Sequence, residues 1–239
     1  MKIALLGYGK MGKAIEKMAI ERGHEIGLKI DSNNSKSLNI NSFIDIDVAI
    51  DFSIPTTAQG NIEIALKSKT PIISGTTGWL EALESVKNLC ISQNSAFLYA
   101  SNFSLGVNLF FELNKNLAKL MSKHTNYNIS MEEIHHVQKL DAPSGTAITL
   151  AEQIISSNQN KTNWILNEAT SIEEIPIEAR RENTVPGTHI VTYQSEIDSL
   201  SITHEAHSRK GFALGAVIAS EWIRNKKGIF SMKDVLFSD

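Results

Sequence analysis

The stretch Ile3-Ala-Leu-Leu6, followed at once by Gly7-Tyr8-Gly9-Lys10-Met11-Gly12, decides the fold of the first part of the chain. Four apolar residues predict a buried strand that enters a G-x-G-x-x-G turn, and a helical pattern follows to about Gly23. Glu25 to Ile30 predicts a second strand, which ends at Asp31, 19 residues after the last glycine of the turn. This order of strand, turn, helix, strand and acid is typical of a dinucleotide-binding unit.

The chemistry of such a unit explains its residue types. Glycines let the backbone approach a pyrophosphate at the start of the helix, and Asp31 can accept hydrogen bonds from the adenosine ribose. A flavodoxin-like or nucleotide-free α/β domain with a tight first turn is the alternative.

Three further apolar runs, Val48–Phe52, Pro71–Ser74 and Ala96–Ala100, predict parallel strands alternating with helices. Because ligands of such sheets bind outside the carboxyl ends of the strands, the clusters at those ends should form one cofactor-binding rim. Besides the glycine turn and Asp31, the rim comprises Phe52 and Ser53, then Gly75, Thr76 and Thr77, and finally Ala100, Ser101, Asn102 and Phe103.

The second half has a different pattern. Asn128–His135, Thr188–Tyr193 and Ser199–Thr203 read as strands that no helices separate. Residues 156–187 are polar and contain Pro176 and Pro186, so they are predicted to hold loops and short elements. The predicted fold is therefore α/β: a Rossmann-type doubly wound parallel sheet domain plus a second α+β domain with a mostly antiparallel or mixed sheet. We expect a dinucleotide-binding domain over 1–103 and 213–239, and a substrate-binding and oligomerisation domain over 104–212.

The segment from Met131 to Ala147 concentrates groups that suit an anionic substrate. It contains two adjacent histidines, His135 and His136, then Lys139, and then the turn Ser144-Gly145-Thr146. Apolar residues at helical spacing follow, so Ser144 is predicted to cap a helix. The N–H groups of Gly145 and Thr146 would then point at an anion, with proton donors beside it.

Composition excludes several classes of protein. A net charge of −3 over 239 residues favours neither nucleic acid nor an anionic membrane. The apolar runs are too short for a spanning helix or a signal peptide, and a lone Cys90 permits neither an intramolecular disulfide nor a multi-thiolate metal site. We expect a soluble cytoplasmic protein with Cys90 buried.

The chain strongly resembles the 4-hydroxy-tetrahydrodipicolinate reductases, also called dihydrodipicolinate reductases, of bacterial lysine biosynthesis through diaminopimelate. The resemblance runs over nearly the whole chain. The stretches that carry it are the glycine turn, Gly75–Gly78, Ser101–Asn108, Glu133–Ala147, Ile202–Ala206, Arg209–Ala213 and Gly215–Val217, of which the block from His135 to Thr146 is the most specific.

The resemblance implies NAD(P)H-dependent reduction of a cyclic dicarboxylate by a homotetramer. It implies that His135 and Lys139 donate protons, that His136, Ser144, Gly145 and Thr146 bind substrate, and that the rim binds the cofactor. Hydride would come from the nicotinamide. Which proton donor serves the substrate nitrogen, and which assists loss of the hydroxyl, stays open.

Departures from the family pattern bear on the cofactor and the assembly. Many relatives have an arginine in the glycine turn, where this chain has Lys10, and a basic residue after the ribose-binding acid, where it has Ser32. An acid followed by no cation favours a ribose hydroxyl over a 2′-phosphate, so NADH should be preferred to NADPH. The positive charge of Lys10 or Lys36 would still permit some use of NADPH. The stretch from Arg180 to Gly187 is shorter than in many relatives, which bears on the tetramer interface.

Other functions remain possible from the residues alone. An amino-acid dehydrogenase or homoserine dehydrogenase-like enzyme would share the first domain but not the His-His-x-x-Lys segment. A non-catalytic NADH sensor would not need the proton donors. A zinc hydrolase would need several of His135, His136, His189, His204 and His207 together, yet adjacent histidines on a strand point to opposite faces and no His-Glu-x-x-His is present, so no metal site is expected. His204 and Arg209 are expected to brace the return between the domains, and Arg209 could also reach a substrate carboxylate.

Overall fold

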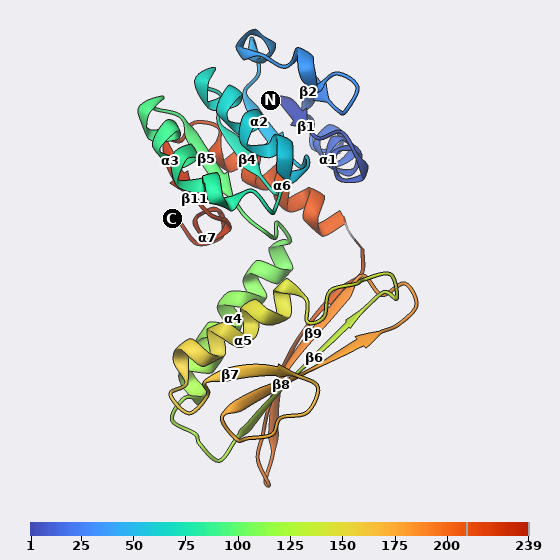
Figure 1. The fold of residues 1–239 in the computed structure, drawn as a ribbon, viewed down its shortest axis with the longest axis vertical. Coiled ribbons are helices and arrows are strands. Elements are labelled where there is room, and N and C mark those ends of the chain that lie inside the picture. The colour runs from blue at the N-terminus through green and yellow to red at the C-terminus, as the bar shows by residue number, and fades with distance from the viewer. Residues whose placement is uncertain (209, 239) are drawn as a thin grey trace. The chain divides into compact units, whose positions relative to one another are not determined.

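The computed structural model describes residues 1–208 and 210–238, and the chain divides into two compact units. One unit is Met1–Leu105 with Lys210–Asp239, and the other is Gly106–Arg209. The boundaries derived from the sequence lie at 103–104 and 212–213, beside these limits. Figure 1 shows the elements of each unit, coloured along the chain.

The first unit contains a parallel six-stranded sheet in the order β11-β5-β4-β3-β1-β2. Its strands are β1 (Lys2–Leu6), β2 (Glu25–Ile30), β3 (Val48–Asp51), β4 (Ile72–Ser74), β5 (Ala96–Tyr99) and β11 (Gly228–Phe230). β1 and β3 are buried along nearly their whole length, as a sheet covered on both faces requires.

Helices cover both faces of this sheet. The buried residues of α1 (Lys10–Glu21) and α6 (Lys210–Ile223) pack against one face, and those of α2 (Pro55–Lys67) and α3 (Leu83–Ser92) against the other. A last helix, α7 (Met232–Phe237), follows β11, and three short 3₁₀ turns lie at η1 (Ser35–Ser37), η2 (Ile40–Phe43) and η3 (Leu80–Ala82). The predicted doubly wound fold is confirmed, with the chain returning to this unit after the second half.

Local sequence explains why the first turn closes so tightly. Gly7 has a φ of +95°, and a Cβ there would lie 2.2 Å from the carbonyl oxygen of Phe52. Only glycine therefore lets β1 turn into α1 beside β3. Pro55 occupies the first position of α2, where its missing N–H removes no helical hydrogen bond.

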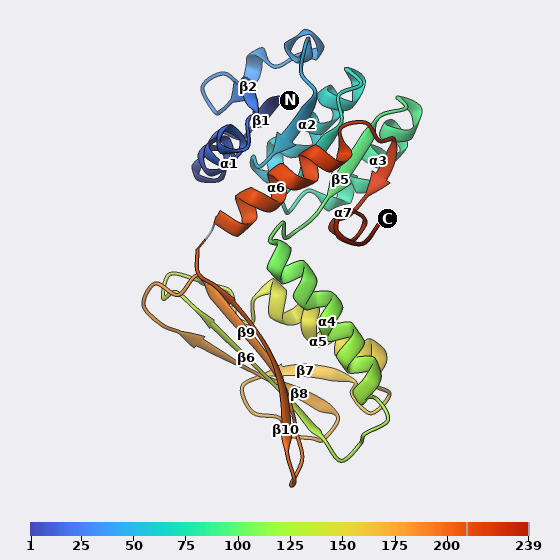
Figure 2. The same ribbon diagram turned by 180° about the vertical axis from the view of Figure 1, so that it is seen from behind.

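The second unit contains a mixed five-stranded sheet in the order β10-β9-β6-β8-β7. Its strands are β6 (Asn128–His135), β7 (Asn163–Leu166), β8 (Glu174–Arg181), β9 (Gly187–Gln194) and β10 (Ser199–Ala206). β9 runs antiparallel to β6 and β10, whereas β8 runs parallel to β6 and β7, which confirms the predicted mixed sheet. Helices α4 (Leu105–Met121) and α5 (Gly145–Ser157) lie side by side along one face (Figures 1 and 2).

The prediction of loops and short elements over 156–187 is wrong in part, because β8 is an eight-residue strand within it. Pro176 argued against a strand, but the ladder between β6 and β8 begins only at Ile177, and Pro176 is paired with Ile165 of the short strand β7 on the other side. Ile175 and Ile177, two residues apart, both point into the core, and this alternation could have indicated the strand.

Two smaller expectations concern burial and the membrane. Cys90 is buried in the first unit, as predicted, and burial raises the pKa of its thiol to about 11. No helix within the described residues is long and apolar enough to cross a membrane.

Candidate active site

The first unit has a cavity at the carboxyl ends of β1, β2 and β3. Its volume is about 560 Å³, and it is lined by Gly7, Tyr8, Gly9, Ile30, Asp31, Ser32, Ser35, Phe52, Ser53, Ile54, Thr57 and Asn61. Three of the predicted rim clusters, the glycine turn, Asp31 and Phe52-Ser53, thus meet at one hollow.

This cavity fits the phosphate and ribose portions of a dinucleotide. Gly9 is the N-cap residue of α1, and a Cβ added to it would meet nothing within 4 Å, so the backbone at the start of the helix is open to a ligand. Asp31 also lines the cavity, and its Oδ1 accepts a hydrogen bond from the backbone N–H of Asn33 at 2.8 Å.

The remaining rim residues do not line this cavity, but several touch its walls. The N–H of Ser53 donates to Thr76 Oγ1 at 2.9 Å, and the ring of Phe52 lies so close to Gly75 that a Cβ there would be 2.4 Å away. Phe103 is a core residue at 1% exposure, with its ring 5.5 Å from that of Phe52, so its side chain supports the wall. Lys10, Met11, Gly12, Thr77, Ala100, Ser101 and Asn102 also lie outside the cavity lining.

A buried carboxylate that the sequence analysis did not select, Asp51, joins these segments. It sits at the end of β3 with no exposed surface and accepts hydrogen bonds from Ser53 Oγ at 2.7 Å, Asn61 Nδ2 at 3.1 Å, Ser74 Oγ at 2.9 Å and Thr76 Oγ1 at 2.7 Å. Burial raises the pKa of Asp51, and the four donors oppose that rise. Asp51 therefore ties the loops after β3 and β4 to each other and to α2.

The lysine that precedes Asp31 on β2 is paired with a glutamate. Lys29 Nζ, on the same strand, lies 2.5 Å from Glu16 Oε1, and Glu16 also bonds the hydroxyl of Tyr8. Neither Lys10 nor Lys36 lines the cavity. The wall around Asp31 is thus formed by an acid and hydroxyl-bearing residues.

In the second unit, the predicted helix start is present. Ser144 is the N-cap of α5, and its Oγ accepts a hydrogen bond from the N–H of Ala147 at 3.2 Å. Gly145 and Thr146 form the first turn, whose N–H groups have no acceptors within the helix. The predicted cap at Ser144 is present, and anion binding by Gly145 and Thr146 stays a prediction.

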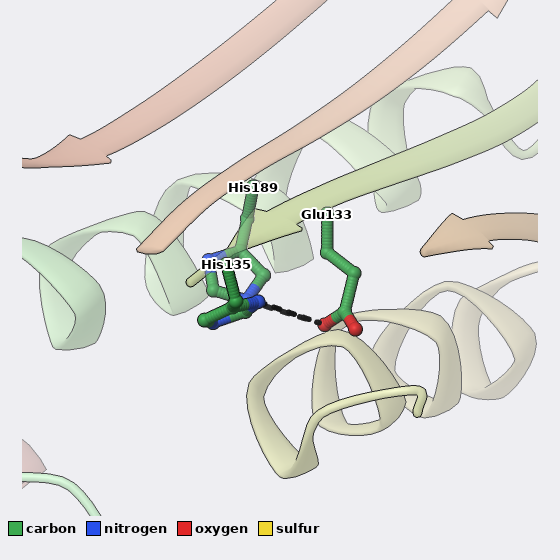
Figure 3. Close-up of side chains that lie close together, drawn as sticks. All are labelled: Glu133, His135 and His189. Atoms are coloured by element: carbon green, nitrogen blue, oxygen red, sulfur yellow. Dashed lines mark ion pairs between the residues drawn. The ribbon is translucent and has the colours of Figure 1, made fainter. Parts of the chain in front are cut away.

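The rings of His135 and His189 lie beside that helix start. Both residues are buried, their ring centroids are 5.1 Å apart, and both rings approach the carboxylate of Glu133 (Figure 3). Glu133 Oε2 is 3.7 Å from His135 Nδ1 and 3.8 Å from His189 Nε2. The same oxygen accepts a hydrogen bond from the N–H of Ser144 at 2.9 Å, which joins His135 to the start of α5.

Burial governs the charge of both rings. Burial lowers the pKa of His189 to about 3, so this ring is neutral at neutral pH, and its Nε2 shares a 3.1 Å hydrogen bond with Ser144 Oγ. Burial also lowers the pKa of His135, and the negative charge of Glu133 opposes that effect.

Lys139 follows β6 in a loop that Arg181 holds in place. Its Nζ lies 2.8 Å from both oxygens of Asp141, and this pairing lowers the pKa of Asp141. Arg181 donates to the backbone carbonyls of Lys139 and Asp141 and, through Nη2, to Glu133 Oε1 at 3.2 Å. His136, the other predicted substrate contact, immediately follows β6 and is half-buried.

Glu133, His135 and His189 also lie close enough together to share a cation, and the described part of the chain holds no second such trio of His, Cys, Asp or Glu. This trio was not predicted from the sequence. Two of its atoms, Glu133 Oε2 and His189 Nε2, already take part in hydrogen bonds with Ser144, and Arg181 brings a positive charge to the same carboxylate. We therefore assign Glu133 and His189 to a hydrogen-bonded network around Ser144 and Arg181, with His135 facing the Glu133 carboxylate.

Sequence reasoning missed Glu133, Arg181 and His189 in this site. A signal existed for Glu133, because it lies two residues before His135 on a strand and so shares its face. His189 is paired with Glu133 across β6 and β9, a register that local sequence does not reveal. His204 lies on β10 opposite His189, with its ring 5.9 Å from that of Phe110, and Arg209 is outside the described residues.

Comparisons with known proteins show the family to which the chain belongs. The family model for the N-terminus of dihydrodipicolinate reductase matches residues 1–103, and the model for its C-terminus matches residues 106–236. The 4-hydroxy-tetrahydrodipicolinate reductase of Christiangramia forsetii is 55% identical over 236 residues, covering 99% of this chain and 98% of the relative. That of Lawsonia intracellularis is 33% identical, with 95% and 96% covered.

Solved structures support the fold. A dipicolinate-bound dihydrodipicolinate reductase from Paenisporosarcina sp. TG-14 superposes with a TM-score of 0.79 at 22% identity, covering 99% of both chains. A probable dehydrogenase from Thermotoga maritima reaches a TM-score of 0.56 at 8% identity. With two family models spanning nearly its full length and a relative 55% identical throughout, the chain belongs to the dihydrodipicolinate reductase family of oxidoreductases.

Proposed function

We propose that this protein reduces 4-hydroxy-tetrahydrodipicolinate to tetrahydrodipicolinate with NADH, in the diaminopimelate route to lysine. The observation that carries the proposal is the joining of His135 to the capped start of α5 through Glu133, with Lys139 in the adjacent loop. Two relatives named 4-hydroxy-tetrahydrodipicolinate reductase, which match 99% and 95% of this chain, support the proposal.

The reaction assigns a task to each part of the site. The substrate, NADH and one proton give tetrahydrodipicolinate, NAD⁺ and water. When bound, the nicotinamide supplies the hydride. The N–H groups of Gly145 and Thr146 bind a substrate carboxylate at the positive end of α5, together with Ser144 and His136. His135 and Lys139 supply protons for the ring nitrogen and for the departing hydroxyl, and the ring C–H proton lost in the elimination of water returns one of them, so one proton is consumed overall.

The cofactor is held by the rim of the first unit. The backbone of Gly7–Gly12 binds the pyrophosphate at the start of α1, and Asp31 accepts hydrogen bonds from the adenosine ribose. The rest of the rim is formed by Phe52-Ser53, Gly75–Thr77 and Ala100–Phe103. NADH is preferred because Asp31 would repel a 2′-phosphate and Lys29 is paired with Glu16. Comparing kcat/KM for the two cofactors tests this preference, and a clear preference for NADPH would contradict it.

Assembly as a homotetramer is the corresponding proposal for the second unit. Both of its helices cover one face of the sheet, which leaves residues such as Thr188, Ile190 and Thr192 on the other face, available to another copy. Light scattering coupled to size exclusion gives the mass directly, and a monomer mass would overturn the proposal.

The test of the function follows NADH absorbance after addition of freshly prepared condensation product of pyruvate and aspartate semialdehyde. We expect rapid oxidation by the wild-type protein, and a loss of about 10² to 10⁴-fold in His135→Gln, the usual range for a general acid. Failure of a folded, NADH-binding wild-type protein to oxidise NADH would overturn the proposal. Activity retained in the variant would overturn the role of His135 alone.

A further inference from the structure

Glu133 is a carboxylate with no exposed surface that contacts four separate parts of the second unit. It accepts hydrogen bonds from the N–H of Ser144 at the start of α5 and from Arg181 on β8, and it faces His135 on its own strand and His189 on β9. Such a group is costly to bury unless it is fully paired. Its partners here include the groups to which the proposed function assigns the substrate carboxylate and a proton.

The two ring nitrogens of His135 have different surroundings. Its Nδ1 is buried without a hydrogen-bond partner, and the nearest anionic atom is Glu133 Oε2, 3.7 Å away. On its other side, a Cβ added at Gly187 would lie 3.1 Å from Nε2, so the glycine provides the space that the ring occupies. Nδ1 is therefore directed to the carboxylate, which leaves Nε2 to exchange a proton with substrate.

The other titratable and charged groups around His135 do not stabilise its protonated form. Lys139, Arg181 and His136 each lower the pKa of His135, as burial does, whereas Glu133 raises it. His189, packed against the ring from β9, is neutral at neutral pH because burial lowers its pKa to about 3.

We propose that Glu133 is a positioning residue for the reduction: it holds the Nδ1 side of His135 as the counter-charge of the imidazolium, and it fixes the start of α5 through the N–H of Ser144. One carboxylate thereby sets the distance between the proton donor and the carboxylate-binding turn. The inference rests on the proposed function, because it assumes that His135 is the proton donor.

The chain contains a matched control for this residue. Glu132 precedes Glu133 on β6 and pairs with Arg180 at 2.7 Å, just as Glu133 pairs with Arg181 at 3.2 Å. Glu132 points to the opposite face of the sheet and is half-buried. Glu132→Gln therefore removes the same charge from the same strand without touching the site.

The experiment measures kcat/KM against pH for wild type, Glu133→Gln and Glu132→Gln, with NADH affinity as a separate readout. A proton donor is active below its pKa, so a lower pKa of His135 moves the fall in activity to lower pH. We expect this shift in Glu133→Gln only, giving kcat/KM roughly ten-fold below wild type above neutral pH with unchanged NADH affinity. An unshifted profile, or an equal shift in Glu132→Gln, would overturn the proposal.

Two further variants provide independent checks of the proposal. Arg181→Gln removes a charge that lowers the pKa of His135, so its profile should move in the opposite direction, to higher pH, even if Glu133→Gln does not fold. In a His135→Gln background, Glu133→Gln should cause no further loss of kcat. If the second substitution instead multiplies the loss, Glu133 acts apart from His135 and the proposal fails, whereas full activity of His135→Gln would refute the proposed proton donor itself.

Discussion

The two units each place a fully buried carboxylate at the edge of a site, and the two carboxylates have different surroundings. Asp51, in the first unit, is held by three hydroxyl groups and one amide, all neutral. Glu133, in the second, is held by Arg181, a backbone N–H and two imidazole rings. A neutral shell can only hold geometry, whereas a shell of cations and imidazoles can also change its protonation.

This contrast matches the proposed division of labour. A cofactor site must keep several loops in register but does not itself exchange protons with the dinucleotide. The substrate site must deliver protons beside a carboxylate-binding turn. Substitutions can therefore distinguish a structural role of Asp51 from an effect of Glu133 on the charge of its neighbours.

Asp51→Ala should lower the free energy of unfolding by about 3 to 5 kcal/mol, because it leaves several buried donors without an acceptor. Asp51→Asn should cost less, since its amide oxygen still accepts from some of the donors. Urea denaturation monitored by circular dichroism measures both. An Asp51→Ala protein of wild-type stability would show that this network does not hold the loops after β3 and β4.

Asp31→Ser should reduce kcat/KM with NADH by about 10 to 150-fold, the range for losing a charge-assisted hydrogen bond to the ribose. Its kcat/KM with NADPH should fall less or rise, because the repulsion of a 2′-phosphate is removed. Steady-state kinetics with both cofactors measure the ratio. An unchanged ratio would place the adenosine ribose away from Asp31.

Ser144→Ala should have the smallest effect on stability, about 1 kcal/mol, as expected for a lost helix cap. Its N–H still donates to Glu133, so the pH dependence of kcat/KM should keep its wild-type shape while KM for the substrate rises. Thermal unfolding and pH-resolved kinetics check the two expectations. A shifted pH profile would mean that the hydroxyl, through His189, also controls the charge of His135.

Local signals in the sequence were sufficient for the parts of the fold that depend on neighbouring residues. The glycine turn after β1, Pro55 at the start of α2 and Ser144 at the start of α5 each have a short-range physical cause. The alternation within β6 even indicated that Glu133 and His135 share a face.

The missed residues depend on strand register instead. Glu133 faces His189 because β6 pairs with β9, and Arg181 lies opposite His135 because β6 pairs with β8. β8 was itself overlooked because of Pro176. Asp51 reads as an acid that ends an apolar run, and only the positions of Ser74, Thr76 and Asn61 show that its carboxylate is buried among donors.

The pKa of His135 in solution tests the difference between the two carboxylates most directly. Protein with isotope-labelled histidine can be titrated with pH by NMR, and the ring resonance of His135 is assigned from its absence in His135→Gln. We predict a lower pKa of His135 in Glu133→Gln than in the wild-type protein, and an unchanged pKa in Glu132→Gln and Asp51→Asn. An unchanged pKa in Glu133→Gln would contradict the account, because Glu133 would then be as purely structural as Asp51.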